Sequence, residues 1–288
     1  MKGKILLILF LFVKISLFSQ VKGKVVDVNN NPIAYVNIWV QNETIGTTSD
    51  EDGSFYLPVK EDKVLIFSAI GFEKVFIKSS EAALVKMKSM TYELNEVVVL
   101  NKKETKEVEI GMPTSFSQAF ENGPKTDARF FPYNAKVKKN RYIKKVSIFT
   151  ENNLETATVK IHFYAVNSEG LPGEELLSKD LIVQVKKGSR KTYFDVSNRN
   201  IVFPREGLFV SVERLFIDKN KFSKTSTAAD GTTKTHMVYY PLLFYNYIER
   251  DFTYTFYGGN WHKEFKKSAD TTIKNRVFEP SITLILTN

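Results

Sequence analysis

The stretch GKVVDVNNNPIAYVNIWV, residues 23–40, decides the fold of the N-terminal part of the chain. Asparagine tolerates a left-handed backbone and proline fixes φ, so the cluster at residues 29–32 reverses the chain between two strands. Alternation then divides the second strand into two faces, with Val36, Ile38 and Val40 on one and Tyr35, Asn37 and Trp39 on the other.

The same period of two continues outward from this hairpin. Short apolar or β-branched stretches recur at residues 44–49, 55–57, 64–69, 75–77, 84–87 and 94–100. Turn residues separate them, as in the sequence DEDG at residues 50–53. Seven or so short strands in about eighty residues, with scarce helical periodicity, predict a small β-sandwich over residues 20–100.

The order of turn and core residues over residues 21–88 resembles the carboxypeptidase regulatory-like domain, a family with a transthyretin-like sandwich. The matching positions are Gly23, Val25, Val26, Asp27, Pro32, Ile33, Val36, Asn37, Ile38, Gly46, Thr47, Thr48, Asp50, Gly53, Phe55, Leu65, Phe67, Ser68, Gly71 and Phe72. The resemblance implies an accessory or interaction module of the envelope of polysaccharide-using Gram-negative bacteria. It implies no peptidase residues.

The segment LNEVVVL at residues 94–100 is similar to the motif that follows this module in outer-membrane receptors energised by the TonB system. A receptor barrel of about 22 strands of about 10 residues each exceeds the 188 residues that follow. We therefore expect a last sandwich strand here rather than a working TonB box. A role as accessory partner of a TonB-energised transporter stays open.

Residues 1–19 have the pattern of a signal peptide. Lys2 and Lys4 precede an apolar run at residues 5–13, and the small residue Ser19 precedes Gln20, where cleavage is expected. The run is too short to cross a bilayer, and no cysteine follows it to carry a lipid anchor. The mature protein is expected to be Sec-exported and extracytoplasmic, in the periplasm or at the cell surface, without a membrane span.

The positive charge is spread along the chain. The formal net charge of +9 falls to +6 once Lys2, Lys4 and Lys14 are removed with the signal peptide. The remaining basic residues are scattered, and export removes the usual nucleic-acid partner. The chain has no cysteine, which excludes disulfides and thiolate chemistry.

A second domain is expected after a charged linker at residues 101–112. Alternation returns in residues 113–288, most clearly at residues 159–165, where Lys160, His162 and Tyr164 face away from the apolar side. We predict a second antiparallel β-sandwich of jelly-roll type. Residues 219–236 are almost devoid of apolar side chains and are predicted to form a mobile loop.

The richest aromatic stretch spans residues 239–261. Sugar rings pack on exposed Tyr and Trp side chains, while most aromatics of a strand pack in a core. We expect most of this stretch to be core and choose Tyr257 and Trp261, beside a flexible turn at residues 258–260, as ligand-binding candidates. The partner is expected to be a glycan or another envelope protein.

Signals for catalysis are absent from the sequence. His162, His236 and His262 are isolated, and no zinc-binding spacing, nucleophile elbow or phosphate loop occurs. No catalytic residue, metal or cofactor is therefore assigned, and a non-enzymatic role is expected. The alternative is a secreted glycan-active enzyme with its site in the second domain, which needs two carboxylates converging in a cleft.

Overall fold

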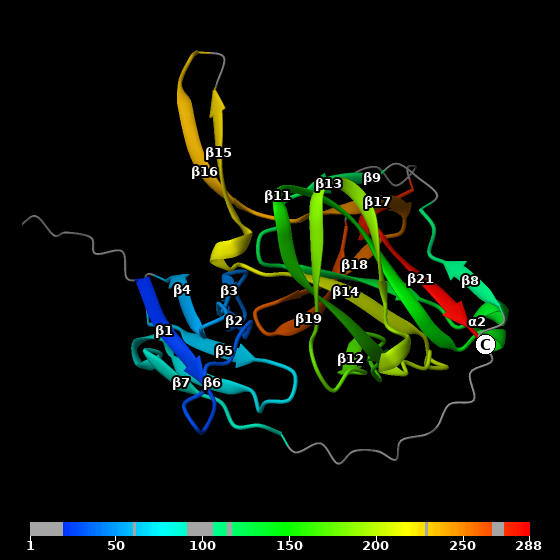
Figure 1. Cartoon of the computed structure of the whole chain (residues 1–288), viewed down its shortest axis with the longest axis horizontal. Helices are drawn as coiled ribbons and strands as arrows, with labels where there is room; N and C mark the ends of the chain where they lie inside the picture. The colour runs from blue at the N-terminus through cyan, green and yellow to red at the C-terminus, as the bar shows by residue number, and fades with distance from the viewer. Residues whose placement is uncertain (1–19, 60–61, 91–105, 114–116, 228–229, 267–273) are drawn as a thin grey trace, which may run out of the picture.

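The computed structural model describes residues 20–59, 62–90, 106–113, 117–227, 230–266 and 274–288. The described part of the chain is nearly all β, with 60% of it in strands and 6% in helices. Two β domains lie side by side, and a two-stranded hairpin projects from the second (Figure 1). The prediction of an all-β sandwich protein is confirmed. The signal peptide through Ser19 and the segment at residues 94–100 lie outside the described residues.

The first domain is a sandwich of two sheets in the orders β4-β1-β7 and β3-β2-β5-β6. Its elements are β1 (Gln20–Val26), β2 (Asn37–Val40), β3 (Gly46–Thr48), β4 (Ser54–Pro58), β5 (Val64–Ser68), β6 (Val75–Lys78), β7 (Leu84–Lys86) and the 3₁₀ turn η1 (Ser79–Glu81). All pairings are antiparallel except β1 with β7.

Both faces of the second strand of the opening stretch are buried. Val36, Ile38 and Val40 lie in the core between the two sheets of the first domain, as the alternation predicts. Tyr35 and Trp39 point the other way, yet only 7% and 2% of their surfaces are exposed. Side chains on this outward face can be buried only by residues outside the sandwich. The second domain covers them.

The second domain contains one continuous network of twelve strands. Its strands are β8 (Glu107–Ile110), β9 (Ser117–Phe120), β10 (Thr126–Phe131), β11 (Tyr142–Val166), β12 (Pro172–Glu175), β13 (Leu181–Asp195), β14 (Leu208–Arg214), β17 (Leu242–Glu249), β18 (Phe252–Tyr257), β19 (Asn260–Phe265), β20 (Arg276–Pro280) and β21 (Ile282–Thr287). A short helix, α2 (Ala135–Lys139), and the 3₁₀ turns η2 (Ser197–Arg199) and η3 (Asp218–Asn220) complete it.

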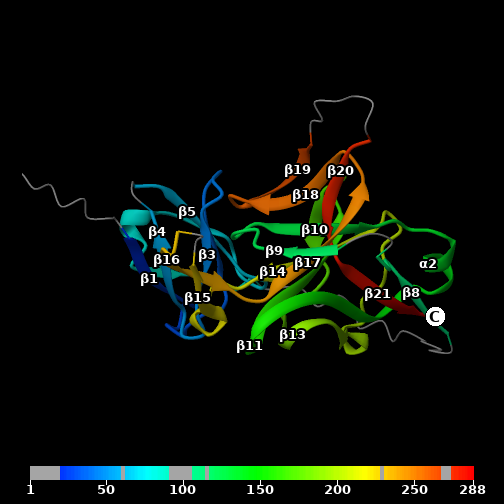
Figure 2. The same ribbon diagram turned by 90° about the horizontal axis from the view of Figure 1, so that it is seen from above.

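The long strand β11 joins the two layers of this domain. Its first half, residues 142–148, pairs with β21, and its second half, residues 159–165, pairs with β14. β13 accompanies it along most of its length, and β18, β19 and β10 extend the β14 side (Figure 2). The second half of β11 carries the side chains that face the first domain.

Two local predictions were wrong. Four residues of the expected linker form β8, which pairs with the last strand because Val108 and Ile110 alternate with glutamates. The expected mobile loop at residues 219–236 forms most of a hairpin of β15 (Lys221–Thr227) and β16 (Thr233–Tyr239). Most of its side chains are exposed, so cross-strand backbone hydrogen bonds hold it where apolar burial cannot.

Candidate functional site

The junction between the domains has an apolar part. The Tyr35 side chain packs with buried Leu215 and Ile217 of the second domain. The Trp39 ring meets Phe256 of β18 edge to face, with centroids 5.9 Å apart. Aromatic pairs of this geometry stabilise a contact beyond the area they bury. The outward face of β2 is therefore the docking face of the first domain.

The turn between β18 and β19 inserts into this junction. The Gly258 carbonyl accepts a hydrogen bond of 3.2 Å from the backbone N–H of Asn42. Gly258 and Gly259 are both buried, and a Cβ on Gly259 would lie 2.4 Å from the Ile66 side chain. The two glycines beside Tyr257 thus allow close packing against the first domain, a role that the sequence did not indicate.

Polar contacts hold the other end of the junction. The Lys219 ammonium donates to Glu51 and, at 2.9 Å, to the hydroxyl of Tyr35. The backbone N–H of Asp218 donates to Asp50 at 2.9 Å. The acidic turn at residues 50–53, read from the sequence as a plain hairpin turn, thus also contacts the second domain.

A cleft of about 680 Å³ lies between the domains beside these contacts. The first domain contributes Asn37, Phe72 and Met90 to its walls, and the second contributes residues from β11, β12, β14 and the β18–β19 turn. A volume in this range suits a small ligand, and domain junctions are common places for ligand sites. Neither domain encloses the cleft alone.

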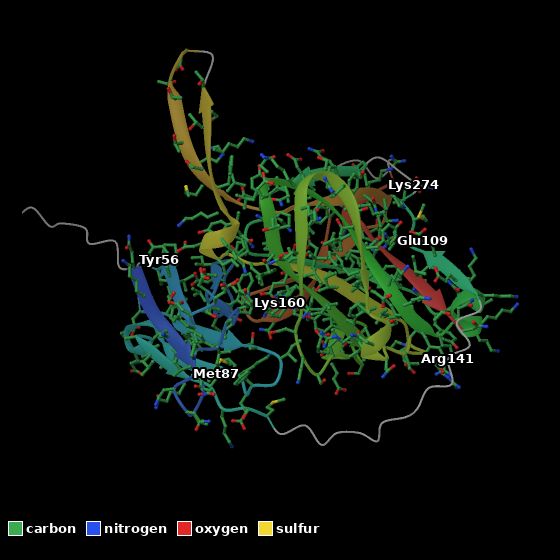
Figure 3. All side chains as sticks on the ribbon, viewed as in Figure 1. Tyr56, Met87, Glu109, Arg141, Lys160 and Lys274 are labelled. Carbon is green, nitrogen blue, oxygen red and sulfur yellow. The ribbon has the colours of Figure 1, made fainter. Side chains whose placement is uncertain are left out.

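Lys160 of β11 lies at the boundary between the domains (Figure 3). Its side chain is only 2% exposed. Its ammonium donates to the carbonyl of Tyr35 at 2.5 Å and lies 3.5 Å from Oδ2 of Asp180. A buried ammonium needs such partners, so Lys160 connects the backbone of the first domain to a carboxylate of the second.

His162, two residues along β11, lies between two glutamates. Its Nδ1 is 2.9 Å from Glu175 Oε2, and its Nε2 is 3.0 Å from Glu213 Oε2. The other oxygen of Glu175 accepts the backbone N–H of Phe163 at 2.8 Å. The ring nitrogens point to opposite sides, so the carboxylates flank the imidazole and do not converge with it on one point, as metal ligands do.

The imidazole of His162 is positively charged at neutral pH. Burial lowers its pKa, but the hydrogen bonds and charges of Glu175 and Glu213 outweigh burial and raise the pKa to about 10. Burial also raises the pKa of Glu213, whereas the Lys160 ammonium and the bonded imidazolium lower it, with a net shift downward. Glu213 is therefore ionised.

Two residues that line the cleft each have one carboxylate oxygen that receives no hydrogen bond from the described residues. These oxygens are Oε1 of Glu213 and Oδ1 of Asp180, and both atoms are buried. Glu213 as a whole is only 6% exposed. A buried acceptor without a donor costs free energy, so these two oxygens could accept hydrogen bonds from a donor that reaches them.

Aromatic rings form one wall of the cleft. Trp261 lines it and packs edge to face on Tyr164 and Phe256, with centroids 5.5 and 5.3 Å apart. Tyr257 lies elsewhere: its ring stacks on His262, and the Lys125 ammonium lies 4.8 Å from its centroid. Of the two ligand-binding candidates, only Trp261 is among the residues that line the cleft.

The isolation of His162 in the sequence was misleading. Its partners Glu175 and Glu213 are 13 and 51 residues away, so no local spacing identifies them. The available signal was the polar face of β11, where alternation placed Lys160, His162 and Tyr164 together. All three line the cleft.

A second, smaller cavity of about 350 Å³ lies within the second domain and is lined by Asp127 and Glu264. Burial raises the pKa of Asp127 to about 6. Both of its oxygens accept hydrogen bonds of 2.6 Å, from Thr255 and Asn122. Each oxygen of Asp127 is thus hydrogen-bonded within the second domain.

The chain contains a CarboxypepD_reg-like domain: residues 21–99 match that family. This match and the seven-stranded sandwich confirm the resemblance inferred from the turn residues. The matched residues cover the first domain.

The chain is also similar to the TonB-dependent receptor SusC of Bacteroides thetaiotaomicron. The two are 34% identical over 108 residues, which are 36% of this chain and 11% of the receptor. Two solved structures, infectious bursal virus derived T=1 particles and the VP2 subviral particle of infectious bursal disease virus, are 9% and 10% identical. They cover 88% of this chain and 54% and 56% of theirs, with TM-scores of 0.22 and 0.23, too low to show a shared fold.

The match with SusC relates about a third of the chain to a TonB-dependent receptor. Within the described residues, no helix has the length and apolar character needed to span a bilayer.

Proposed function

We propose that this is an exported, non-enzymatic protein of the cell envelope that binds a saccharide in the cleft between its domains. The observation that carries this proposal is that an aromatic wall and an acidic wall line the same cavity of about 680 Å³. One wall is the aromatic surface of Trp261, and the other presents the carboxylates of Asp180 and Glu213. Saccharides offer an apolar ring face to the first and hydroxyl donors to the second.

The chemistry of the carboxylates in this cleft supports binding rather than glycoside hydrolysis. A hydrolase needs a carboxylic acid whose pKa is raised, so that it can protonate the leaving oxygen. The pKa of Glu213 is shifted downward. Both oxygens of Glu175 are engaged, one by His162 and one by the backbone of Phe163. An ionised carboxylate such as that of Glu213 accepts hydrogen bonds and has no proton to donate to a leaving group.

The comparisons support a place at the envelope. Part of the chain is similar to a TonB-dependent receptor, and the N-terminal segment has the sequence pattern of an export signal. An exported protein with these two domains is suited to present a saccharide near an outer-membrane transporter.

A glycan array with the mature protein tests the binding function. Trp261→Ala is expected to abolish the array signal, because it removes the aromatic wall of the cleft. Trp261 is half-buried, so the Tm is expected to fall only slightly. Phe265→Ala is the matched control, since Phe265 is an aromatic of the same strand, 65% exposed and outside this cleft. Binding that survives Trp261→Ala contradicts the proposal, and loss of the folded circular-dichroism spectrum assigns Trp261 to the core.

The similarity to SusC favours a second candidate function, that of an accessory partner of a TonB-energised transporter. Affinity capture with the tagged full chain from solubilised outer membrane is expected to recover a transporter of that class. Recovery in equal amount by a control bait, the isolated tag, would exclude it.

A further inference from the structure

We propose that the saccharide bound in the cleft carries a free amine, and that its ammonium group lies between Glu213 and Asp180. This inference rests on the proposed function and names the ligand class more narrowly. It is carried by the charge of the cleft interior, by two unpartnered oxygens and by the neighbouring rings.

The interior of the cleft has more negative than positive groups. Glu175, Asp180 and Glu213 are three carboxylates that are buried or half-buried, while Lys160 and His162 are two buried cations. Glu169 and Lys74 also line the cleft, but both are exposed and their charges are opposite. The downward shift of the Glu213 pKa and the upward shift of the His162 pKa keep both groups charged at neutral pH. One negative charge is left over, and an uncompensated charge in a dry site is costly.

The positions of the free acceptors indicate where a cation would lie. Glu213 and Asp180, which line the cleft, each have a buried carboxylate oxygen, Oε1 and Oδ1, that receives no hydrogen bond from the described residues. Both residues flank Lys160, whose ammonium lies 3.5 Å from the other oxygen of Asp180 and which is paired across the strands with Glu213. An ammonium has three donors, enough for both oxygens and a further acceptor.

The remaining walls favour an organic cation over a metal ion. Trp261 and Tyr164 place aromatic rings in the same cleft, and such rings attract organic cations. Among the described residues, no group of three or more potential ligands is arranged to hold a metal. A neutral hydroxyl satisfies an acceptor but leaves the excess charge in place.

Binding of three oligosaccharides with the same β-1,4 backbone tests the inference. Tetramers of glucosamine, N-acetylglucosamine and glucose present an ammonium, an acetamide and a hydroxyl at the same ring position. Titration calorimetry is made with the full mature chain at about pH 6, where a sugar amine is protonated. The glucosamine tetramer is expected to bind at least about tenfold more tightly than the other two, because hydrogen bonds to charged groups are the stronger ones.

Substitutions of the cleft carboxylates test where the ammonium group of the ligand lies. Asp180→Asn keeps the shape of the side chain but removes its charge, and is expected to reduce the preference for the glucosamine tetramer by about tenfold. Glu213→Gln is expected to do the same where it folds. Glu169→Gln is the control, because Glu169 lines the same cleft but is exposed.

The outcomes separate this inference from the proposed function. Equal or tighter binding of the glucose tetramer overturns the ammonium inference but supports saccharide binding. No binding of any tetramer overturns the ammonium inference, and the glycan array then decides the proposed function separately. A preference for the glucosamine tetramer that is unchanged in Asp180→Asn and reduced in Glu169→Gln assigns the effect to surface charge and also overturns it.

Discussion

At the scale of single residues, His162 is the group whose state most depends on its neighbours. Its two hydrogen bonds to glutamates exist only in the folded chain, so its pKa falls from about 10 to the ordinary value of 6.5 on unfolding. The folded state therefore binds a proton more tightly than the unfolded state. The stability gained is fully present below the unfolded pKa and is lost as pH rises through the folded one.

We therefore predict that the free energy of unfolding decreases between about pH 6.5 and about pH 10, by up to about 1.4 kcal/mol per pH unit from this group. Urea denaturation at successive pH values measures it. His162→Gln is expected to flatten the slope, whereas His236→Gln, at an exposed position of β16, is expected to retain it. Equal slopes in the wild type and His162→Gln would contradict the charge assigned to the imidazole.

The sequence predicted only that certain cleft residues lie on one face of a strand, and not which other residues they contact. Alternation in β11 indicates that Lys160, His162 and Tyr164 point together, because successive side chains of a strand alternate. The partners of His162 come from β12 and β14, and pairing between distant strands has no local signal. Trp261 was chosen as a ligand-binding candidate because it follows a glycine turn. In the structure the glycines of this turn allow close packing against the first domain.

At the scale of elements, the turn between β18 and β19 depends on glycine for two reasons. Gly258 has a φ of +58°, and a Cβ there would lie 2.8 Å from the Asn42 Cα of the first domain. Gly123 has nearly the same φ, +56°, and none of the described heavy atoms lies within 4 Å of the place that a Cβ would take there. At both positions a side chain would strain the left-handed backbone. Only at Gly258 would its Cβ also clash with the first domain.

We predict that Gly258→Ala destabilises the protein by at least about 1 kcal/mol more than Gly123→Ala, since left-handed backbone strain is common to both and only the first overpacks a junction. Denaturant unfolding measures the difference. The chain has two tryptophans, Trp39 and Trp261, and both lie at the junction. A red shift of emission is therefore expected in Gly258→Ala alone. Equal free energies for the two variants would show that the turn does not press on the first domain.

The elements that could be predicted were those with alternating apolar residues. The strands of the first domain follow this rule, and the opening stretch gives the correct inner face. β8 and the β15–β16 hairpin were missed because charged or polar side chains dominate them. Their strands are held by backbone pairing, which depends on a partner and leaves little trace in composition.

At the scale of the whole molecule, Lys160 connects the domains through a buried ammonium. Its bond to the Tyr35 carbonyl crosses the junction, and so does the more exposed contact of Lys219 with Glu51. Breaking a buried ionic contact leaves an unpaired partner in a dry site, whereas an exposed ion pair contributes little.

We predict that Lys160→Met lowers the free energy of unfolding by about 3 kcal/mol and that Lys219→Met lowers it by less than about 1 kcal/mol. Calorimetry is expected to show one unfolding transition for the wild type and two for Lys160→Met, because the junction then opens before the cores. Two transitions in the wild type would contradict the coupling of the domains.

The burial of the outward face of β2 against the second domain affects whether the first domain can be moved to another protein. CarboxypepD_reg-like domains are separable units in principle, but here Tyr35, Trp39 and the backbone of Asn42 are committed to one neighbour. A transplant of residues 20–90 to another protein would expose two large aromatic rings. A chimera would therefore need polar residues in place of Tyr35 and Trp39 to avoid exposing an apolar patch that promotes association.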